Sequence, residues 1–435
     1  SGAPRTLPGM GDTTRPLPPE AVLALVSKGT DIIIPLANGE PAGVMDAIEA
    51  AADELSGVRV HQMHVLHDRP YLDGRHGDRL RHVSYFLSEV TRPHYHAGGL
   101  DLVPAHFSEV PLLLRHNCRR PLIIAAASLP DRHGYFSLGT NADYVSPFIG
   151  RWPIFIEANE QMPRTFGRNS IHISQVAGWS VCDRPLVEVP PAEPDELDRR
   201  IAGYIAERIP DRATIQCGIG SIPNAVMAGL TEHRELGIHT ELISDGMVDL
   251  IERGVVTGVH KRRRLNKAVT TFALGTRRLY EFLHENPGIE FLPVDWVNDP
   301  RIIAQNSRMV SINATTEVDL IGQCASETIA GRYWSGSGGQ ADFARGAMFS
   351  DEGQGFIVLR STTRDGSISR IVPRLTGGSV VTTIKNTVDK VVTEWGVAEL
   401  RGRSLDQRAA ALIGIAHPDY REELTKEARA LGYLR

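Results

Sequence analysis

The stretch Ala213–Leu230, ATIQCGIGSIPNAVMAGL, indicates how this chain folds. The short apolar run Ala213–Cys217 predicts a buried strand, and the apolar residues of Asn224–Leu230 follow the spacing of a helix. Two glycines and Pro223 separate the two segments, and proline suits the first turn of a helix. The stretch therefore predicts one strand–turn–helix unit of an α/β protein.

The same alternation of apolar runs and amphipathic stretches continues in both directions along the chain. Further strands are expected at Asp31–Pro35, Val58–His61, Leu122–Ala127, Ile154–Glu157, Ile238–Ile243 and Ala268–Leu274. Helices are expected over Pro41–Leu55, Pro104–His116 and Met247–Arg253, and within Arg403–Leu434 on either side of His417-Pro418. Because short buried strands alternate with helices throughout, the predicted fold class is α/β.

A proline-rich segment marks the expected domain boundary. The chain has 435 residues, which corresponds to roughly two large domains or three of average size. The segment Asp183–Arg200, DRPLVEVPPAEPDELDRR, contains four prolines, and Pro190-Pro191 cannot continue a helix or a central strand. We therefore expect two open-sheet α/β domains of similar size, residues 1–190 and 191–435.

The composition argues against several classes of protein. Lys and Arg number 47 against 52 Asp and Glu, a formal net charge of −5, which does not favour binding to nucleic acid or to an anionic membrane. No run approaches the roughly 18 apolar residues of a membrane span, and Ser1–Pro19 lacks the apolar centre of a secretory signal.

Cysteine and histidine spacing predicts neither disulfides nor a metal site. The chain has four cysteines, namely Cys118, Cys182, Cys217 and Cys324. None belongs to a C-x-x-C pair, which is typical of a reducing cytoplasm. The pairs His61/His64 and His94/His96 have a spacing that metal ligands could use, but no Cys or carboxylate cluster in the sequence completes either set. We therefore expect no metal, with these histidines at a surface or an interface.

The glycine turn after Cys217 is the first of three groups that could carry chemistry. Glycines allow a ligand to approach the backbone, and free N–H groups at a helix start attract anions. Glu241 follows Gly218 by 23 residues (241 − 218), so the pattern resembles a dinucleotide-binding fingerprint. Pro223 stands where that fingerprint needs its third glycine. NAD binding is therefore disfavoured, and a tight turn without any ligand stays an alternative.

The second group is the segment Gly237–Gly246, GIHTELISDG, which contains Glu241. The apolar neighbours of Glu241 predict a strand, and a carboxylate at such a position serves either a structural pairing or chemistry. From the residues alone the structural role is favoured. Ser244 or Asp245 is expected to cap the helix that begins near Met247.

The third group is the glycine-rich loop in Ser335–Ala347, SGSGGQADFARGA. Its backbone N–H groups could form an oxyanion hole or hold an amide or phosphate, and a plain surface loop is the alternative. Asp342 could cap the next turn, and Arg345 could pair with an anion. The basic run His260–Arg264 is expected to be a solvated turn, with contact to ligand phosphates as the second possibility.

Together these segments resemble the acetyl-CoA hydrolase/transferase family, most closely its 4-hydroxybutyrate CoA-transferase branch. In the first half the resemblance rests on DRHGYFSLGTNADY (Asp131–Tyr144) and ANEQMPRTFGRNSIHIS (Ala158–Ser174). In the second half it rests on GIGSIPNAV, GIHTELISDGMVDLIERG, GGQADFARGA and the long segments Phe291–Gln323, Ser367–Gly402 and Ala410–Leu424. The matching segments follow in the right order over nearly the whole chain.

The resemblance implies a role for each of the three groups. Glu241 corresponds to the nucleophilic glutamate of the family. The CoA-binding loop corresponds to Gly218, Ile219, Gly220, Ser221 and Ile222. The second glycine loop, which contacts CoA and the oxyanion in relatives, corresponds to Ser335, Gly336, Gly338 and Gly339. Arg360 matches a basic residue that contacts CoA.

The activity implied by the resemblance is transfer of CoA from an acyl-CoA to a free short-chain carboxylic acid. The mechanism that the resemblance implies is ping-pong, through an acyl–glutamyl anhydride and a glutamyl-CoA thioester. No resident cofactor is expected, since CoA and acyl-CoA are substrates. The resemblance also implies a site in the cleft between the two domains and a homodimer or higher oligomer. Hydrolysis of acyl-CoA by the same glutamate is the alternative, and a non-catalytic CoA-ester or dinucleotide binding protein is a more distant one.

Overall fold

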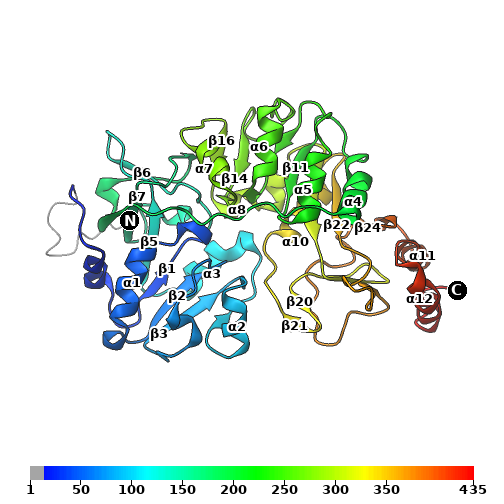
Figure 1. Cartoon of the computed structure of the whole chain (residues 1–435), viewed down its shortest axis with the longest axis horizontal. Coiled ribbons are helices and arrows are strands. Elements are labelled where there is room, and N and C mark those ends of the chain that lie inside the picture. Colours follow the sequence, from blue (N-terminus) through cyan, green and yellow to red (C-terminus); the bar gives the residue numbers. More distant parts are fainter. Residues whose placement is uncertain (1–13) are drawn as a thin grey trace. The chain divides into compact units, whose positions relative to one another are not determined.

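The computed structural model describes residues 14–435 and divides into two compact units (Figure 1). The first unit takes the chain up to Val189 together with Val269–Val297, and the second takes Pro190–Ala268 and Asn298–Arg435. The sequence predicts a single boundary, between residues 1–190 and 191–435. The structure differs because Val269–Val297 belongs to the first unit. The signal-peptide prediction rests on Ser1–Pro19, of which residues 1–13 lie outside the described part.

A seven-stranded parallel sheet organises the first unit, in the order β10-β7-β5-β1-β2-β3-β4. Its strands are β1 (Asp31–Ile33), β2 (Val58–Gln62), β3 (Leu80–Ser84), β4 (Asp101–Leu102), β5 (Pro121–Ala127), β7 (Ile154–Asn159) and β10 (Gly178–Cys182). Every residue of β7 is buried, as expected for a parallel strand covered on both faces. The predicted strands at β1, β2, β5 and β7 are confirmed to within a few residues.

Helices and short strands complete the first unit. The helices are α1 (Ala42–Ala50), α2 (Thr91–His96), α3 (Val110–Asn117), α7 (Arg277–Leu283) and α8 (Val294–Val297). The 3₁₀ turns are η1 (Pro19–Leu25), η2 (Ala37–Gly39), η3 (Ala52–Glu54), η4 (Pro70–Asp73), η5 (Phe107–Glu109), η6 (Ser146–Phe148) and η7 (Ile173–Gln175). The short strands are β6 (Tyr135–Ser137), β8 (Phe166–Gly167), β9 (Ser170–His172), β15 (Phe272–Ala273) and β16 (Ile289–Phe291), with β14 (Ala268–Thr270) beginning where the chain enters this unit.

The second unit is built on a six-stranded sheet in the order β12-β11-β17-β22-β24-β25, parallel except for the last pair. Its strands are β11 (Thr214–Cys217), β12 (Gly237–Ile238), β17 (Met309–Ala314), β22 (Gln354–Val358), β24 (Lys390–Thr393) and β25 (Gly396–Glu399). Short strands are β13 (Leu242–Ile243), β18 (Glu317–Asp319), β19 (Cys324–Ala325), β20 (Thr328–Ile329), β21 (Arg332–Tyr333) and β23 (Ile371–Val372). The prediction of two open-sheet α/β domains is therefore confirmed.

The helices of the second unit follow the predicted pattern. They are α4 (Glu196–Ala206), α5 (Ser221–Ala228), α6 (Asp245–Glu252), α9 (Pro300–Ile303), α10 (Gln340–Phe349), α11 (Leu405–Gly414) and α12 (Pro418–Ala430). The break at His417-Pro418 is confirmed, and Leu412 and Leu424 join the two C-terminal helices to the core around Val391 of β24.

Two segments predicted as single strands are each interrupted, and so these two predictions are wrong. The same kind of hydrogen bond lies at both interruptions. The segment Ile238–Ile243 forms β12 and β13 with a bend between them, and Ala268–Leu274 forms β14 and β15. At each break a threonine hydroxyl donates to the carbonyl two residues ahead, from Thr240 to Leu242 at 3.0 Å and from Thr270 to Phe272 at 2.9 Å. Such local side-chain bonds compete with the strand ladder.

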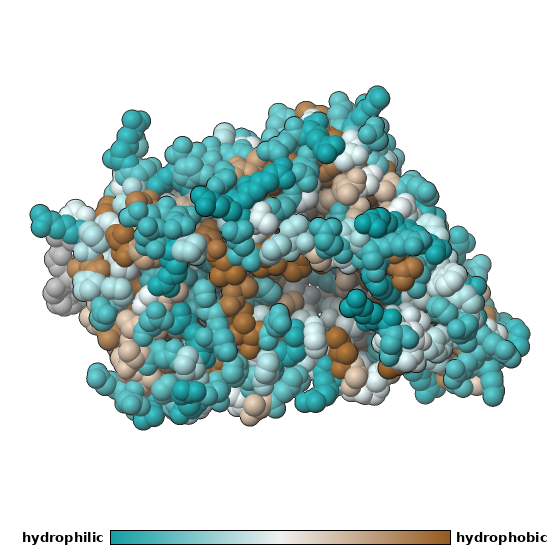
Figure 2. Space-filling view, in the orientation of Figure 1, coloured by the Kyte–Doolittle hydropathy of each residue, from teal (hydrophilic) through white to brown (hydrophobic). Residues whose placement is uncertain are grey.

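Among residues 14–435, no helix has both the length and the apolar character needed to cross a bilayer. The face seen in Figure 2 is mainly hydrophilic, with apolar side chains in small separate patches.

Candidate active site

Glu241 lies on the bend between β12 and β13 and not inside a strand. The bend follows directly from the carboxyl end of β12, and open α/β sheets bind ligands at that end of their strands. The residue keeps partial contact with solvent. The helix that follows begins at Asp245, with Ser244 at the N-cap position but without a side-chain capping bond.

The Asn298 side chain holds the Glu241 carboxylate directly. Asn298 is fully buried, and its Nδ2 donates to Glu241 Oε2 at 2.8 Å. Asn298 begins the second segment of this unit, 57 residues after Glu241. Asn298 is not among the site residues that the sequence predicts, because asparagine before Asp-Pro is most simply explained as a turn signal.

The environment of Glu241 changes its acidity. Burial raises the pKa of Glu241 to about 7, the Asn298 hydrogen bond opposes this shift, and the negative charge of Asp342 adds to it. Asp342 is itself buried in the first turn of α10. Glu241 is therefore a carboxylate that is more basic than a solvated one, held by a neutral amide donor and facing a like charge.

The second glycine loop lies against this carboxylate. A Cβ added to Gly339 would collide with Glu241 Oε2 and with Asn298 Nδ2, so any other residue at this position would displace these two side chains. Gly339 is also the N-cap residue of α10, which makes no side-chain capping bond there. Asp342 is thus inside the helix and does not cap it, and the Arg345 guanidinium lies over the Phe349 ring at 5.8 Å.

The first glycine loop joins β11 to α5 at the predicted turn. Gly220 has φ +131°, a conformation that favours glycine, and Pro223 occupies the first turn of α5. The N–H of Gly218 donates to the Ile312 carbonyl at 3.1 Å and extends the β11–β17 pairing. It is therefore not available as an oxyanion donor, whereas Ile219 is half exposed.

Two basic positions differ from their expected environments. The Arg360 guanidinium pairs with Asp195 and Asp198 of the α4 start, each at 2.7 Å, so a CoA phosphate would have to compete with two carboxylates. In the run His260–Arg264, the arginines are exposed, but Lys261 is buried. Its Nζ donates at 2.9 Å to the Ile238 carbonyl, at the end of the strand that leads to Glu241.

One histidine does have a thiol and a carboxylate beside it. The first unit brings Asp31 and Cys118 next to His61, whereas His64, its partner in the sequence pair, does not belong to this group. These two lie 30 residues before and 57 residues after His61 (118 − 61), so no local spacing reveals the group.

The comparisons with known proteins agree along the chain. The acetyl-CoA hydrolase/transferase N-terminal domain matches residues 16–191, and the C-terminal domain of the same family matches residues 275–428. Glu241 and the loop Gly218–Ile222 lie between the two matches.

Individual relatives cover almost the entire chain. The succinyl-CoA:cyclohexane-1-carboxylate CoA transferase of Geobacter metallireducens is 46% identical over 96% of this chain and 95% of its own length. The 4-hydroxybutyrate coenzyme A transferase of Clostridium kluyveri is 39% identical over 94% of this chain and 96% of its own. The crystal structure of RipA from Yersinia pestis has a TM-score of 0.91 at 36% identity, covering 96% of this chain and 98% of that one. With both domain models and full-length relatives in agreement, the chain belongs to the acetyl-CoA hydrolase/transferase family and is a CoA-transferase of that family.

Proposed function

We propose that this enzyme moves CoA from an acyl-CoA thioester to a free short-chain carboxylate, with Glu241 as the covalent nucleophile. The observation that carries the proposal is the fit between the Glu241 carboxylate, the Asn298 amide and the glycine backbone at Gly339. The Glu241 carboxylate accepts a hydrogen bond from the neutral Asn298 amide and lies against the Gly339 backbone, an arrangement that suits a carboxylate nucleophile.

The reaction follows from exchange between carboxylate and thiolate. A Glu241 oxygen bonds to the thioester carbonyl carbon, the C–S bond breaks, and CoA thiolate leaves an acyl–glutamyl anhydride. The thiolate then attacks the glutamyl carbonyl, the C–O bond breaks, and the first acid departs as its carboxylate. The resulting glutamyl-CoA thioester reacts with the second carboxylate by the reverse steps, so thioester energy is kept and no net proton is needed.

The raised basicity of Glu241 suits it to attack. A carboxylate in a buried site is a stronger nucleophile than a solvated one, because water does not have to be removed from it at the moment of reaction. With a pKa of about 7, much of Glu241 is ionised at neutral pH without a general base. Activity that requires the ionised form therefore falls as the pH drops below about 7.

The glycine loops would bind CoA and stabilise the oxyanions. The residues that we assign to CoA binding are Gly218, Ile219, Gly220, Ser221, Ile222, Ser335, Gly336, Gly338, Gly339 and Arg360. Because the Gly218 N–H bonds to the Ile312 carbonyl, Gly218 would contact CoA through its other atoms. One well-aimed oxyanion donor contributes roughly 2.7–4 kcal/mol in other enzymes. The long CoA chain supplies binding energy far from the reacting carbon.

Hydrolysis is the second candidate, and the partial solvent contact of Glu241 favours it. Water that reaches the anhydride or the glutamyl-CoA thioester would convert transfer into hydrolysis. A panel of acyl-CoAs tested with and without acceptor acids separates the two activities, since only hydrolysis consumes thioester when no acid is added.

The decisive test of the nucleophile is Glu241→Gln, with Glu235→Gln as a matched control. Glu235 is an exposed carboxylate of the same unit, paired with His260. We expect parallel double-reciprocal lines and a CoA mass adduct on Glu241 in the parent enzyme and in Glu235→Gln, and neither transfer nor adduct in Glu241→Gln. Full transfer by Glu241→Gln would refute the proposal.

We also propose that the protein is a homo-oligomer, that it is cytoplasmic and that it has no resident cofactor.

A further inference from the structure

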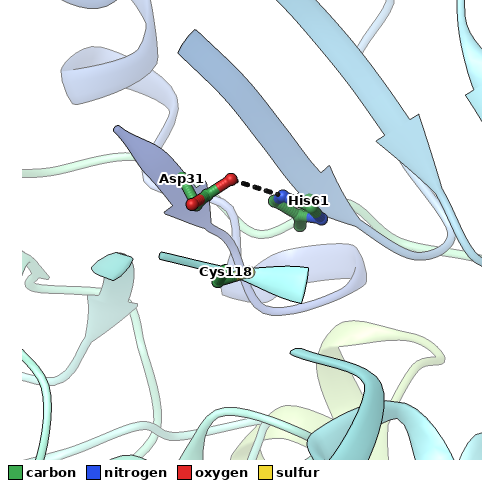
Figure 3. A group of neighbouring side chains, drawn as sticks. All are labelled: Asp31, His61 and Cys118. Carbon is green, nitrogen blue, oxygen red and sulfur yellow. Dashed lines mark hydrogen bonds and ion pairs between the residues drawn. The ribbon is translucent and has the colours of Figure 1, made fainter. Parts of the chain in front are cut away.

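A group of potential metal ligands lies in the first unit, apart from Glu241 and its partners. Asp31 begins β1, His61 lies on β2, and Cys118 occupies the turn between α3 and β5. Strand β1 pairs with both β2 and β5, which brings these three chain segments together. One ligand atom from each of the three side chains lies within 4.8 Å of the other two. Figure 3 shows the carboxylate of Asp31 directed at the His61 ring, with Cys118 beside them.

The spacing of two of these atoms fits a shared ion. His61 Nε2 lies 3.3 Å from Asp31 Oδ1. Tetrahedral zinc with N and O ligands at about 2.0–2.1 Å holds those ligands about 3.3 Å apart. A hydrogen bond between an imidazolium and a carboxylate is shorter, at about 2.7–2.9 Å. The observed distance is long for a charge-assisted hydrogen bond and fits two ligands of one ion.

Further contacts orient both ligands from behind. His61 Nδ1 lies 2.9 Å from the hydroxyl of the buried Tyr85, which leaves Nε2 for the ion. Asp31 Oδ2 accepts from the backbone N–H groups of Arg119 at 2.8 Å and Arg120 at 3.2 Å, which leaves Oδ1. Metal-binding histidines and carboxylates are typically held in this way by an outer layer of hydrogen bonds.

The donor set selects the kind of ion. The side chains of His61 and Asp31 are 6% and 13% exposed, and Cys118 is 8% exposed, so the ion would be largely shielded from bulk water. One sulfur, one nitrogen and one oxygen suit Zn²⁺, whereas Mg²⁺ and Ca²⁺ require oxygen ligands.

We propose that Asp31, His61 and Cys118 bind one Zn²⁺ ion through Oδ1, Nε2 and Sγ. The ion ties β1, β2 and the turn before β5 together at the middle of the sheet, and its fourth position is open to a water molecule. The proposal is independent of the role of Glu241, which belongs to the other unit. The alternative is a hydrogen-bonded chain of Asp31, His61 and Tyr85 without a metal ion, in which the Cys118 thiol has no ligand role.

The test uses the full chain, stripped with a chelator and titrated with Zn²⁺ and then with Co²⁺ as a spectroscopic probe. We expect one Zn²⁺ per chain in competition with a chromophoric chelator. We also expect a thiolate-to-Co²⁺ charge-transfer band with the visible bands of tetrahedral coordination. Cys118→Ser should lose the charge-transfer band, and Tyr85→Phe should keep it while weakening Zn²⁺ binding on the order of 10- to 100-fold.

Cys182→Ser is the matched control. The Cys182 sulfur lies 3.6 Å from Glu157 Oε1, a thiol beside a carboxylate, and no imidazole belongs to that pair among the described ligand groups. This variant should bind like the parent chain, and so should Glu241→Gln, which separates the metal site from the proposed nucleophile. Failure of the parent chain to bind Zn²⁺ stoichiometrically overturns the proposal, as does an unchanged Co²⁺ spectrum in Cys118→Ser. If Cys118→Ser does not fold, His61→Gln replaces it. Loss of the tetrahedral Co²⁺ bands in His61→Gln would support the proposal, and their retention would overturn it.

Discussion

At the scale of single residues, the raised pKa that suits Glu241 to nucleophilic attack also lowers the free energy of unfolding. Burial gives it a pKa of about 7 in the folded protein, against about 4.3 in an unfolded chain. A carboxyl group whose pKa is raised on folding binds more protons in the native state, so its ionisation opposes folding. The cost is absent below the unfolded pKa, grows as the pH rises through the window up to about 7, and is then constant.

Glu241→Gln is therefore expected to stabilise the protein above pH 7. The gain is at most about 4 kcal/mol, from 1.36 kcal/mol per pKa unit over a pKa difference of about 2.7, and it should disappear near pH 4. Thermal unfolding of the parent and the variant across this pH range measures it. An equal difference in melting temperature at pH 4 and pH 8 would contradict the linkage.

Asn298→Ala removes the donor that stabilises the ionised form of Glu241. We expect the pKa of Glu241 to rise further, so the acid limb of the pH–rate profile moves to higher pH. A hydrogen bond to a charged group contributes roughly 1.5–3 kcal/mol, which corresponds to about a 10- to 100-fold loss of kcat at neutral pH. Asn286→Ala is the control, since the Asn286 side chain bonds to Phe282 and Gly288 in its own loop.

Asp342→Asn should act in the opposite direction. Removing the negative charge lowers the pKa of Glu241, and the acid limb of the pH–rate profile moves to lower pH. The readout is the position of that limb and not the maximal rate, because a packing defect would lower the rate at every pH. A limb that stays in place or moves upward would show that Asp342 does not tune Glu241.

At the scale of elements, the start of α10 and the bend after β12 form the site together. Gly339→Ala is expected to push the Glu241 carboxylate and the Asn298 amide out of position. A displacement of about 1 Å in a reacting group can cost roughly 100-fold in rate, so we expect a loss of kcat of that order.

Gly414→Ala is the matched control for that substitution. Gly414 ends α11, and a Cβ there meets no atom within 4 Å. It should leave kcat unchanged and alter stability by no more than about 1 kcal/mol in the favourable direction. Steady-state kinetics with circular dichroism on both variants checks the pair, and similar rates in the two would exclude the steric argument.

At the scale of the whole molecule, the first unit needs the segment Val269–Val297. The Tyr280 hydroxyl of this segment donates to the Val187 carbonyl at 2.8 Å and lies 3.0 Å from Asn38 Nδ2, and the Val294 N–H donates to the Asp143 carbonyl at 2.9 Å. A fragment of residues 1–190 should therefore not fold to a native state. Amide exchange and circular dichroism of the fragment test this, and a cooperative unfolding transition would contradict it.

Local patterns along the chain predict most of the elements, and the resemblance to a family identifies the candidate nucleophile. The run Pro121–Ala127 is apolar throughout and Ile154–Ile156 is apolar as well, and such local patterns are enough to identify buried strands. The bend at Glu241 was not predicted, because the apolar residues around it are typical of a continuous strand. The hydrogen bond from the Thr240 hydroxyl to the Leu242 carbonyl, which competes with strand pairing, has no signature in that pattern.

Only the tertiary structure decided which distant residues meet. Asn298 reaches Glu241 across 57 residues, and Cys118 reaches Asp31 across 87 residues (118 − 31). Lys261 belongs to a basic run that predicts a solvated turn, yet its ammonium is buried against two backbone carbonyls. The physical reason is that periodicity records which face of an element is buried, whereas the order of strands in a sheet decides which side chains from separate elements share that interior.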